Sequence, residues 1–210
     1  MHYKKTQEIK YVWLWIGLLV IFALLHSNYA QAQNSLLQKN APEKTVFAFL
    51  NWYKNNKSAL DQINVINNYL SEDSSKPYSI NFQKTEQYIS LVQKSKCVSA
   101  EYLNNWREYF RKCDKQFIKL HLFEGPAEGL EFDYVMLVQD YGNDLNELNR
   151  AKVVKTQTIN NTAYVTVEFL YKDKYLYKLT KNSNQWLIDG IKLISSASIE
   201  GNAVHPFTIK

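Results

Sequence analysis

The feature that most constrains the fold of this chain is a set of four short apolar segments in its last third, separated by a few polar residues each. The segments are 151–159, 163–171, 175–180 and 186–194, and the separators are 160–161, 172–174 and 181–184. Separators this short and polar are typical of hairpin turns. Val165, Val167 and Phe169 share one face of the second segment, and Thr166 and Glu168 share the other. The pattern predicts four antiparallel strands joined in sequence.

Helical spacing replaces this alternation in the first part of the chain. Pro42 suits the first turn of a helix. Val46, Phe49, Leu50 and Tyr53 then follow at steps of three and four residues, which places them on one apolar stripe. We therefore predict a helix that begins near Pro42 and buries this stripe. The segment 71–77 is polar and is predicted to be a loop.

Two further helices are predicted before residue 120. The first is short and covers 85–94. The second follows Ser99, whose hydroxyl suits an N-cap, and Glu101 is favourable in its first turn. The apolar stripe of this longer helix consists of Tyr102, Trp106, Tyr109, Phe110, Cys113 and Phe117.

The segment 131–140 changes period again. It alternates imperfectly around Phe132, Tyr134, Met136 and Val138, which predicts a strand after the turn-forming segment 124–129. Helices followed by an antiparallel meander indicate an α+β fold, in which N-terminal helices pack on one face of a curved antiparallel sheet.

The first 32 residues have the pattern of a signal peptide. Three lysines precede an uncharged apolar run over 12–25, and Ala30 and Ala32 flank Gln31 in a small-x-small cleavage pattern. The run of about 14 residues is shorter than the roughly 20 that a membrane-spanning helix needs. We expect cleavage after Ala32, with an uncleaved N-terminal anchor as the alternative. A periplasmic or secreted protein without a stable membrane span follows from cleavage.

The length of the chain suggests its division into segments, and its charge bears on its partners. We expect a signal peptide over 1–32, a flexible leader over 33–41 and a single domain over 42–210. Removing residues 1–32 takes away three lysines and one glutamate, which lowers the formal charge from +5 to +3. The basic residues that remain are scattered, whereas a nucleic-acid-binding surface needs a clustered basic face. We therefore expect no nucleic-acid partner.

Cys97 and Cys113 raise the question of a disulfide in an oxidising compartment. A helix over 100–113 would rise about 20 Å, and the three residues from Cys97 can fold back only about 10 Å. A disulfide requires Cα atoms within about 7 Å. We expect unpaired thiols, and a disulfide only if the helix is shorter. His121 and His205 do not stand at ligand spacing, so we expect no metal and no cofactor.

Four segments together resemble the nuclear transport factor 2-like superfamily, in particular an uncharacterised family of exported bacterial proteins. The segments are VFAFLNWY at 46–53, YISL at 88–91 leading to Tyr102 and Leu103, DY to QD over 133–140, and WLIDGI at 186–191. The resemblance runs from about Glu43 to Ile194. It implies a cone-shaped fold in which helices close one end of a bent sheet around a cavity. Members of the superfamily use this cavity for catalysis, for small ligands and for protein contacts, so the fold does not choose among them.

Three acidic residues are candidates for a site. Asp133 and Asp140 lie among aromatic residues, where burial would shift the pKa of a carboxyl group as a general base requires. In a strand, seven residues would separate them by about 23 Å and turn them to opposite faces. They would then be a turn cap and a solvated side chain. Tyr134 could contribute to the same pocket, and Glu168 would line a cavity or face solvent.

A second group of candidates comes from the helices. Trp52 and Tyr53, with Arg107, could line a pocket mouth and hold an anionic or sugar-like ligand. The alternative is structural: Tyr53 belongs to the core, Trp52 packs where helices meet, and Arg107 pairs with Glu108 or Asp114 on the surface.

No familiar catalytic signature is present, whether a nucleophile elbow, a phosphate-binding loop, a zinc-protease helix or a dinucleotide fingerprint. We therefore expect an exported, non-catalytic module that binds a small ligand or an exported protein partner. An inhibitor that uses the acidic stretch 124–144 is one form of it. The alternatives are a cavity-based hydrolase or isomerase with an aspartate base, and a structural protein of the cell envelope.

Overall fold

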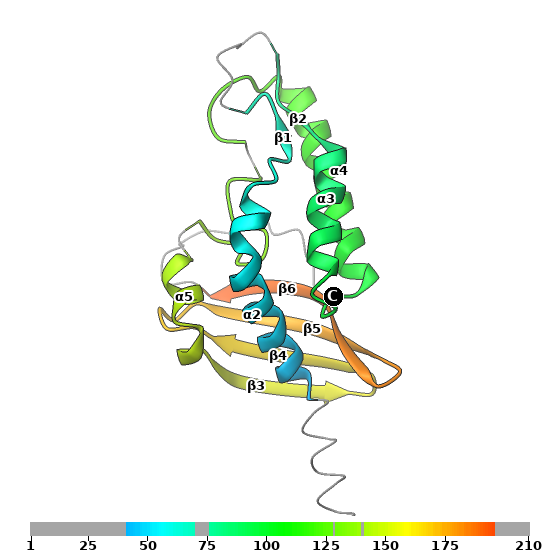
Figure 1. Ribbon diagram of the computed structural model, residues 1–210, viewed down its shortest axis with the longest axis vertical. Coiled ribbons are helices and arrows are strands. Elements are labelled where there is room, and N and C mark those ends of the chain that lie inside the picture. Colours follow the sequence, from blue (N-terminus) through cyan, green and yellow to red (C-terminus); the bar gives the residue numbers. More distant parts are fainter. Residues whose placement is uncertain (1–40, 70–75, 128, 140, 196–210) are drawn as a thin grey trace, which may run out of the picture. The chain divides into compact units, whose positions relative to one another are not determined.

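The computed structural model describes residues 41–69, 76–127, 129–139 and 141–195. Within them the fold is α+β, as the sequence predicts: helices come first and a four-stranded antiparallel sheet follows (Figure 1). The elements are α2 (Pro42–Asp61), β1 (Ile66–Asn67), β2 (Ser79–Ile80), α3 (Phe82–Gln93), α4 (Ala100–Leu120), α5 (Gly142–Asn146), the 3-10 helix η1 (Leu148–Arg150), β3 (Lys152–Ile159), β4 (Thr162–Glu168), β5 (Lys174–Asn182) and β6 (Gln185–Ser195). The predicted signal peptide and residues 33–40 of the predicted leader lie outside the described residues. Pro42 opens the compact unit to which all of these elements belong.

The sheet is the predicted meander, with strand order β3-β4-β5-β6 and antiparallel pairing throughout. Asn160 and Ser183 adopt positive φ in the two tight turns, at 53° and 54°. Asparagine tolerates this conformation better than most residues. The strand predicted over 163–171 ends earlier, at Glu168. The backbone turns there, because the Phe169 N–H bonds to the Asp173 carbonyl at 2.9 Å.

One face of the sheet forms the floor of the hydrophobic core. The side chains on this face are fully buried: Ala163, Val165 and Val167 from β4, Tyr175, Tyr177 and Leu179 from β5, and Ile188 and Ile191 from β6. Helix α2 packs against this layer through contacts with β4 and β6 (Figure 1). Its buried stripe is the predicted one, with Val46, Phe49, Leu50 and Tyr53 at 1 % exposure or less.

The two edges of the sheet differ. The segment before α4 runs along β6 and makes a parallel bridge between Val98 and Ile188. The Ile188 N–H donates to the Cys97 carbonyl at 2.8 Å, and the Ser99 N–H donates to the Ile188 carbonyl at 2.9 Å. Seven of the eight residues of β3, at the other edge, are exposed. Among the described residues, the edge of β6 is therefore covered at Ile188, and no strand pairs with the outer edge of β3.

Capping groups define where helices α3 and α4 begin and where α4 ends. The Ser99 hydroxyl accepts the Tyr102 N–H at 3.1 Å, which confirms the predicted start of α4. The Asn81 side chain accepts the Lys84 N–H at 3.0 Å, so α3 begins three residues before the predicted position. His121 ends α4 in the left-handed region with φ 47°. Helices α3 and α4 pack together beyond the sheet (Figure 1).

The strand predicted over 131–140 is wrong. The described part of this segment is a turn whose residues Val135, Met136, Leu137 and Val138 are all buried. The Asp133 carboxylate accepts the N–H groups two and three residues ahead, and this local capping competes with strand pairing. Leu137 closes the turn at φ 57°. Asp133 therefore does not lie on one face of a strand, and Asp140 lies outside the described residues.

None of the helices in the described ranges has the length and apolar character needed to cross a bilayer.

Candidate functional site

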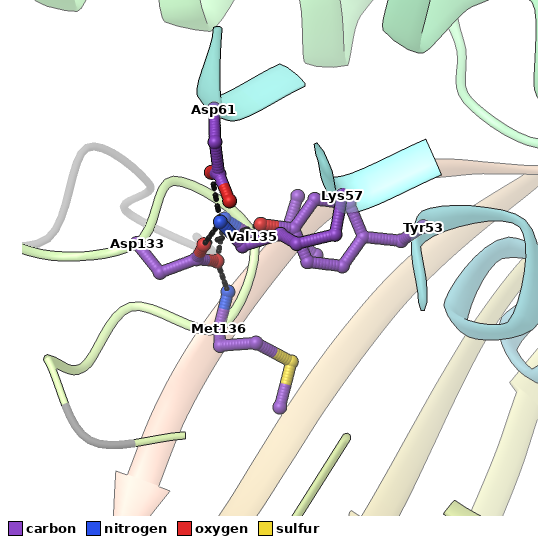
Figure 2. Close-up of polar contacts among 6 residues, drawn as sticks. All are labelled: Tyr53, Lys57, Asp61, Asp133, Val135 and Met136. Atoms are coloured by element: carbon purple, nitrogen blue, oxygen red, sulfur yellow. Dashed lines mark hydrogen bonds and ion pairs between the residues drawn. The ribbon is translucent and has the colours of Figure 1, made fainter. Parts of the chain in front are cut away.

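Asp133 is the centre of a polar cluster between helix α2 and the turn that follows residue 130 (Figure 2). Its side chain is only 5 % exposed. Oδ1 accepts the N–H of Val135 at 2.9 Å and that of Met136 at 2.7 Å. Oδ2 accepts a hydrogen bond from the Tyr53 hydroxyl and lies 3.6 Å from Nζ of Lys57. The carboxylate thus joins the turn to two residues of α2 that are four positions apart.

Lys57 is the cation of this cluster. It pairs with Asp61 one turn further along α2, in addition to Asp133 (Figure 2). Its Nζ also lies 5.3 Å from the centre of the Tyr141 ring, within range of a cation–π interaction. Partial burial lowers the pKa of Lys57, but the bond to Asp61 and the other nearby groups outweigh it, and the net shift is upward. The ammonium group is therefore held in its charged form by its surroundings.

Tyr53 donates to Asp133 from the buried side of α2. Burial, followed by the nearby Asp133 charge, raises the pKa of Tyr53 far above its ordinary value. Its hydroxyl keeps its proton at neutral pH and acts only as a donor to the carboxylate. This contact fixes both residues and gives Tyr53 a structural role as well as a place at the site.

A cavity of about 550 Å³ opens beside the cluster. Its walls come from the second half of α2, from the segment 63–69 that leads through β1, from Tyr88 of α3, and from the segment 130–141. Six aromatic side chains line it: Tyr53, Tyr69, Tyr88, Phe132, Tyr134 and Tyr141. Amide groups of Asn64 and Gln139 are also present, with the carboxylates of Asp61, Glu131 and Asp133. Aromatic surface with a few polar groups is the usual composition of a small-molecule site.

Tyr134 lines the cavity and packs against other aromatic rings. Its ring packs against Tyr88, Trp106 and Phe110, with centroid distances of 5.4, 5.3 and 5.4 Å. Burial raises the pKa of Tyr134 and that of Tyr88. Such edge-to-face and tilted aromatic contacts stabilise one arrangement of the wall.

The structure brings together three of the residues singled out from the sequence. Asp133, Tyr53 and Tyr134 all line the cavity. Trp52 does not line it and instead stacks on Phe49 at a centroid distance of 6.3 Å.

Arg107 and Glu168 lie elsewhere on the molecule. Arg107 makes a two-pronged contact with Glu86 of α3, at 2.8 and 2.9 Å, and also bonds to Asn104. The surface pairing expected for it therefore exists, but with an acid on the neighbouring helix. Glu168 sits in a cluster of lysines on the sheet, 3.9, 3.4 and 3.1 Å from Lys152, Lys172 and Lys174. The bond to Lys174 is the largest of the contacts that lower the pKa of Glu168.

Sequence reasoning missed Lys57, Asp61 and Tyr141. The spacing of Lys57 and Asp61, four residues apart on a predicted helix, was the one available signal, because it indicates an ion pair on one helix face. Nothing in the sequence connects either residue with Asp133.

The cysteines and histidines provide no second site within the described part of the chain. Cys97 and Cys113 are free and buried. Burial raises the pKa of the Cys113 thiol to about 11, which makes it a poor nucleophile at neutral pH. In the described ranges, no group of three or more His, Cys, Asp or Glu side chains is arranged to hold a metal ion.

Comparison of the chain with protein-family models, with curated proteins and with solved structures found no match. What the fold and the site define is an α+β protein with an aromatic cavity beside a fully bonded aspartate.

Proposed function

We propose that this protein is an exported, non-catalytic binding module that holds a small ligand in the cavity between α2 and the segment 130–141. The observation that carries the proposal is the cavity itself, whose size and aromatic lining suit a small organic molecule.

The state of Asp133 supports binding over catalysis. An ionised carboxylate has about four acceptor positions. Two backbone N–H groups, the Tyr53 hydroxyl and the Lys57 ammonium already contact its two oxygens. A general base must offer a lone pair to the proton that it removes. Asp133 would have to break a contact that holds the cavity wall before it could act as one.

Export rests on the N-terminal sequence. The lysines, the apolar run over 12–25 and the small residues at Ala30 and Ala32 are the three parts of a signal peptide in the expected order. An exported binding module would meet its ligand in the periplasm or outside the cell.

Native mass spectrometry tests both export and ligand binding. The protein is purified after expression of the full chain in a bacterial host. The denatured mass should correspond to a chain that begins at Gln33. The non-denatured protein should retain a small molecule, or take one up from an extract of the host envelope.

A matched pair of variants locates the ligand. Tyr141→Ala removes an aromatic side chain from the cavity and should abolish retention. Tyr171→Ala removes an exposed tyrosine that does not line the cavity and should leave retention unchanged. An empty protein under every condition, or equal loss in both variants, contradicts the proposal.

A further inference from the structure

We infer that the ligand of this cavity is an organic cation, with a primary ammonium or guanidinium group on an apolar body. This inference rests on the proposed function and adds the chemical class of the ligand. It begins from the charges of the described residues that line the cavity, which are the three carboxylates of Asp61, Glu131 and Asp133 against the single ammonium of Lys57. The formal charge of this described lining is therefore −2.

The one lining cation is not available to an anionic ligand. Lys57 already pairs with Asp61 and lies 3.6 Å from Oδ2 of Asp133. An anion that reached Lys57 would have to displace one carboxylate while it remained close to the other. Arg107, the other cation considered for an anionic ligand, is held on the outer surface by Glu86.

Acceptors, in contrast, remain available. Glu131 is exposed at the cavity and has no ion-pair partner among the described residues. Asp61 is 56 % exposed and lines the same cavity. Because Asp61 is already paired with Lys57, a ligand cation in the cavity would be attracted chiefly by Glu131, with Asp61 as a further negative charge. The nearby protein surface reduces the screening by water.

Lys57 also shows what kind of group this lining accommodates. Its ammonium lies between two carboxylates and faces the Tyr141 ring at 5.3 Å. Carboxylates combined with an aromatic face are the surroundings that recognise organic ammonium groups. The rings of Tyr69 and Phe132 provide further aromatic surface for the apolar body of such a ligand.

Three probes with the same ring separate the possible classes: benzylamine, benzyl alcohol and sodium benzoate. Binding to the protein purified after expression of the full chain is measured by ligand-observed NMR and calorimetry at low salt. Benzylammonium should bind at least about tenfold more tightly than the other two, because a favourable charge contact of 1.4 kcal/mol corresponds to a factor of ten. The affinity should fall when salt shortens the range of the charges.

Glu131→Gln removes one rim charge and should weaken benzylammonium several-fold. Glu108→Gln, on an exposed position of α4 away from the cavity, should have no effect. Equal or tighter binding of benzyl alcohol or benzoate overturns the inference, as does equal binding to the Glu131→Gln variant. If a retained natural ligand is neutral or anionic and is lost in Tyr141→Ala, the inference fails while the proposed binding function stands. If none of the three probes and no natural ligand binds, both the inference and the proposed binding function fail.

Discussion

Tyr175 and Tyr177 stand two residues apart on β5 with fully buried side chains, and their hydroxyl groups have opposite situations. The Tyr175 hydroxyl donates to the Met136 carbonyl at 2.6 Å and so ties the sheet to the buried turn. The Tyr177 hydroxyl has no hydrogen-bond partner among the described residues. A buried polar group without a partner lowers stability by about 1–3 kcal/mol, whereas a bonded one raises it.

The first prediction compares these two tyrosines. Tyr175→Phe leaves the Met136 carbonyl without its donor and should lower the free energy of unfolding by about 1–3 kcal/mol. Tyr177→Phe removes an unbonded hydroxyl and should leave this free energy unchanged or raise it by about 1 kcal/mol. Urea titrations measure the free energy of unfolding of both variants, and the comparison holds if the dependence of this free energy on urea has the same slope in each. Equal destabilisation by the two substitutions would show that the Tyr177 hydroxyl has a partner in solution.

The second prediction concerns the anchor of the cavity wall. Asp133→Ala deprives the N–H groups of Val135 and Met136 of their acceptor and should lower the free energy of unfolding by about 3–6 kcal/mol, since each of the two bonds to a charged group contributes roughly 1.5–3 kcal/mol. Asp133→Asn keeps Oδ1 as an acceptor and should lose less. If the alanine variant is as stable as the wild type, the turn is held by its apolar residues alone.

The third prediction is alkaline instability. Burial raises the pKa values of Tyr53, Tyr88 and Tyr134 above their ordinary value of 10.0. Above about pH 10 the unfolded chain loses these protons while the folded protein keeps them, so stability falls as the pH rises. Lys57, whose pKa is raised, contributes in the same direction: its share is complete below pH 10.5 and is lost above it. Urea midpoints at pH 8, 10 and 11 should fall in that order, and tyrosinate absorbance from the buried rings should appear only with unfolding.

The fourth prediction uses Lys57 as an internal competitor. Lys57→Met removes the cation from the lining, so benzylammonium should bind several-fold more tightly while the protein becomes less stable. Lys54→Met, one turn earlier on α2, removes a lysine that bonds to the Asn146 carbonyl outside this cavity. It should leave the affinity unchanged. Weaker binding to the Lys57→Met variant would mean that the lysine itself contacts the ligand.

The fifth prediction tests the placement of Arg107. Arg107→Ala should change stability by less than about 1 kcal/mol, because its partner Glu86 is half-exposed and exposed ion pairs contribute little. It should also leave every ligand affinity unchanged. A loss of ligand binding in this variant would place the site on the other side of α3.

The elements that the sequence predicts well are those with local causes. The stripe of α2 follows from side chains three and four residues apart, and the start of α4 follows from the Ser99 hydroxyl and the N–H three residues ahead. The meander follows from alternation and from short polar turns.

The site is predictable only in part, because contacts distant in the sequence create it. Aromatic neighbours pointed to Asp133, but its bonds to Tyr53 and Lys57 depend on how α2 meets a turn 80 residues later. The same carboxylate explains the failed strand. Phe132, Tyr134, Met136 and Val138 alternate as a strand would, and a single capping side chain bends the segment inward.

The two edges of the sheet differ in how readily a strand from another chain could pair with them. The bonds that Cys97 and Ser99 make to Ile188 occupy part of the outer edge of β6, whereas no strand within the described residues pairs with the outer edge of β3. Lys152, Lys155 and the irregular pairing between Val153 and Lys155 are features that discourage such joining. Crosslinks that neutralise the lysines of β3 would remove charges that discourage pairing with another chain, and the exposed edge strand would then favour aggregation. Fusion tags and crosslinks are therefore best placed away from β3.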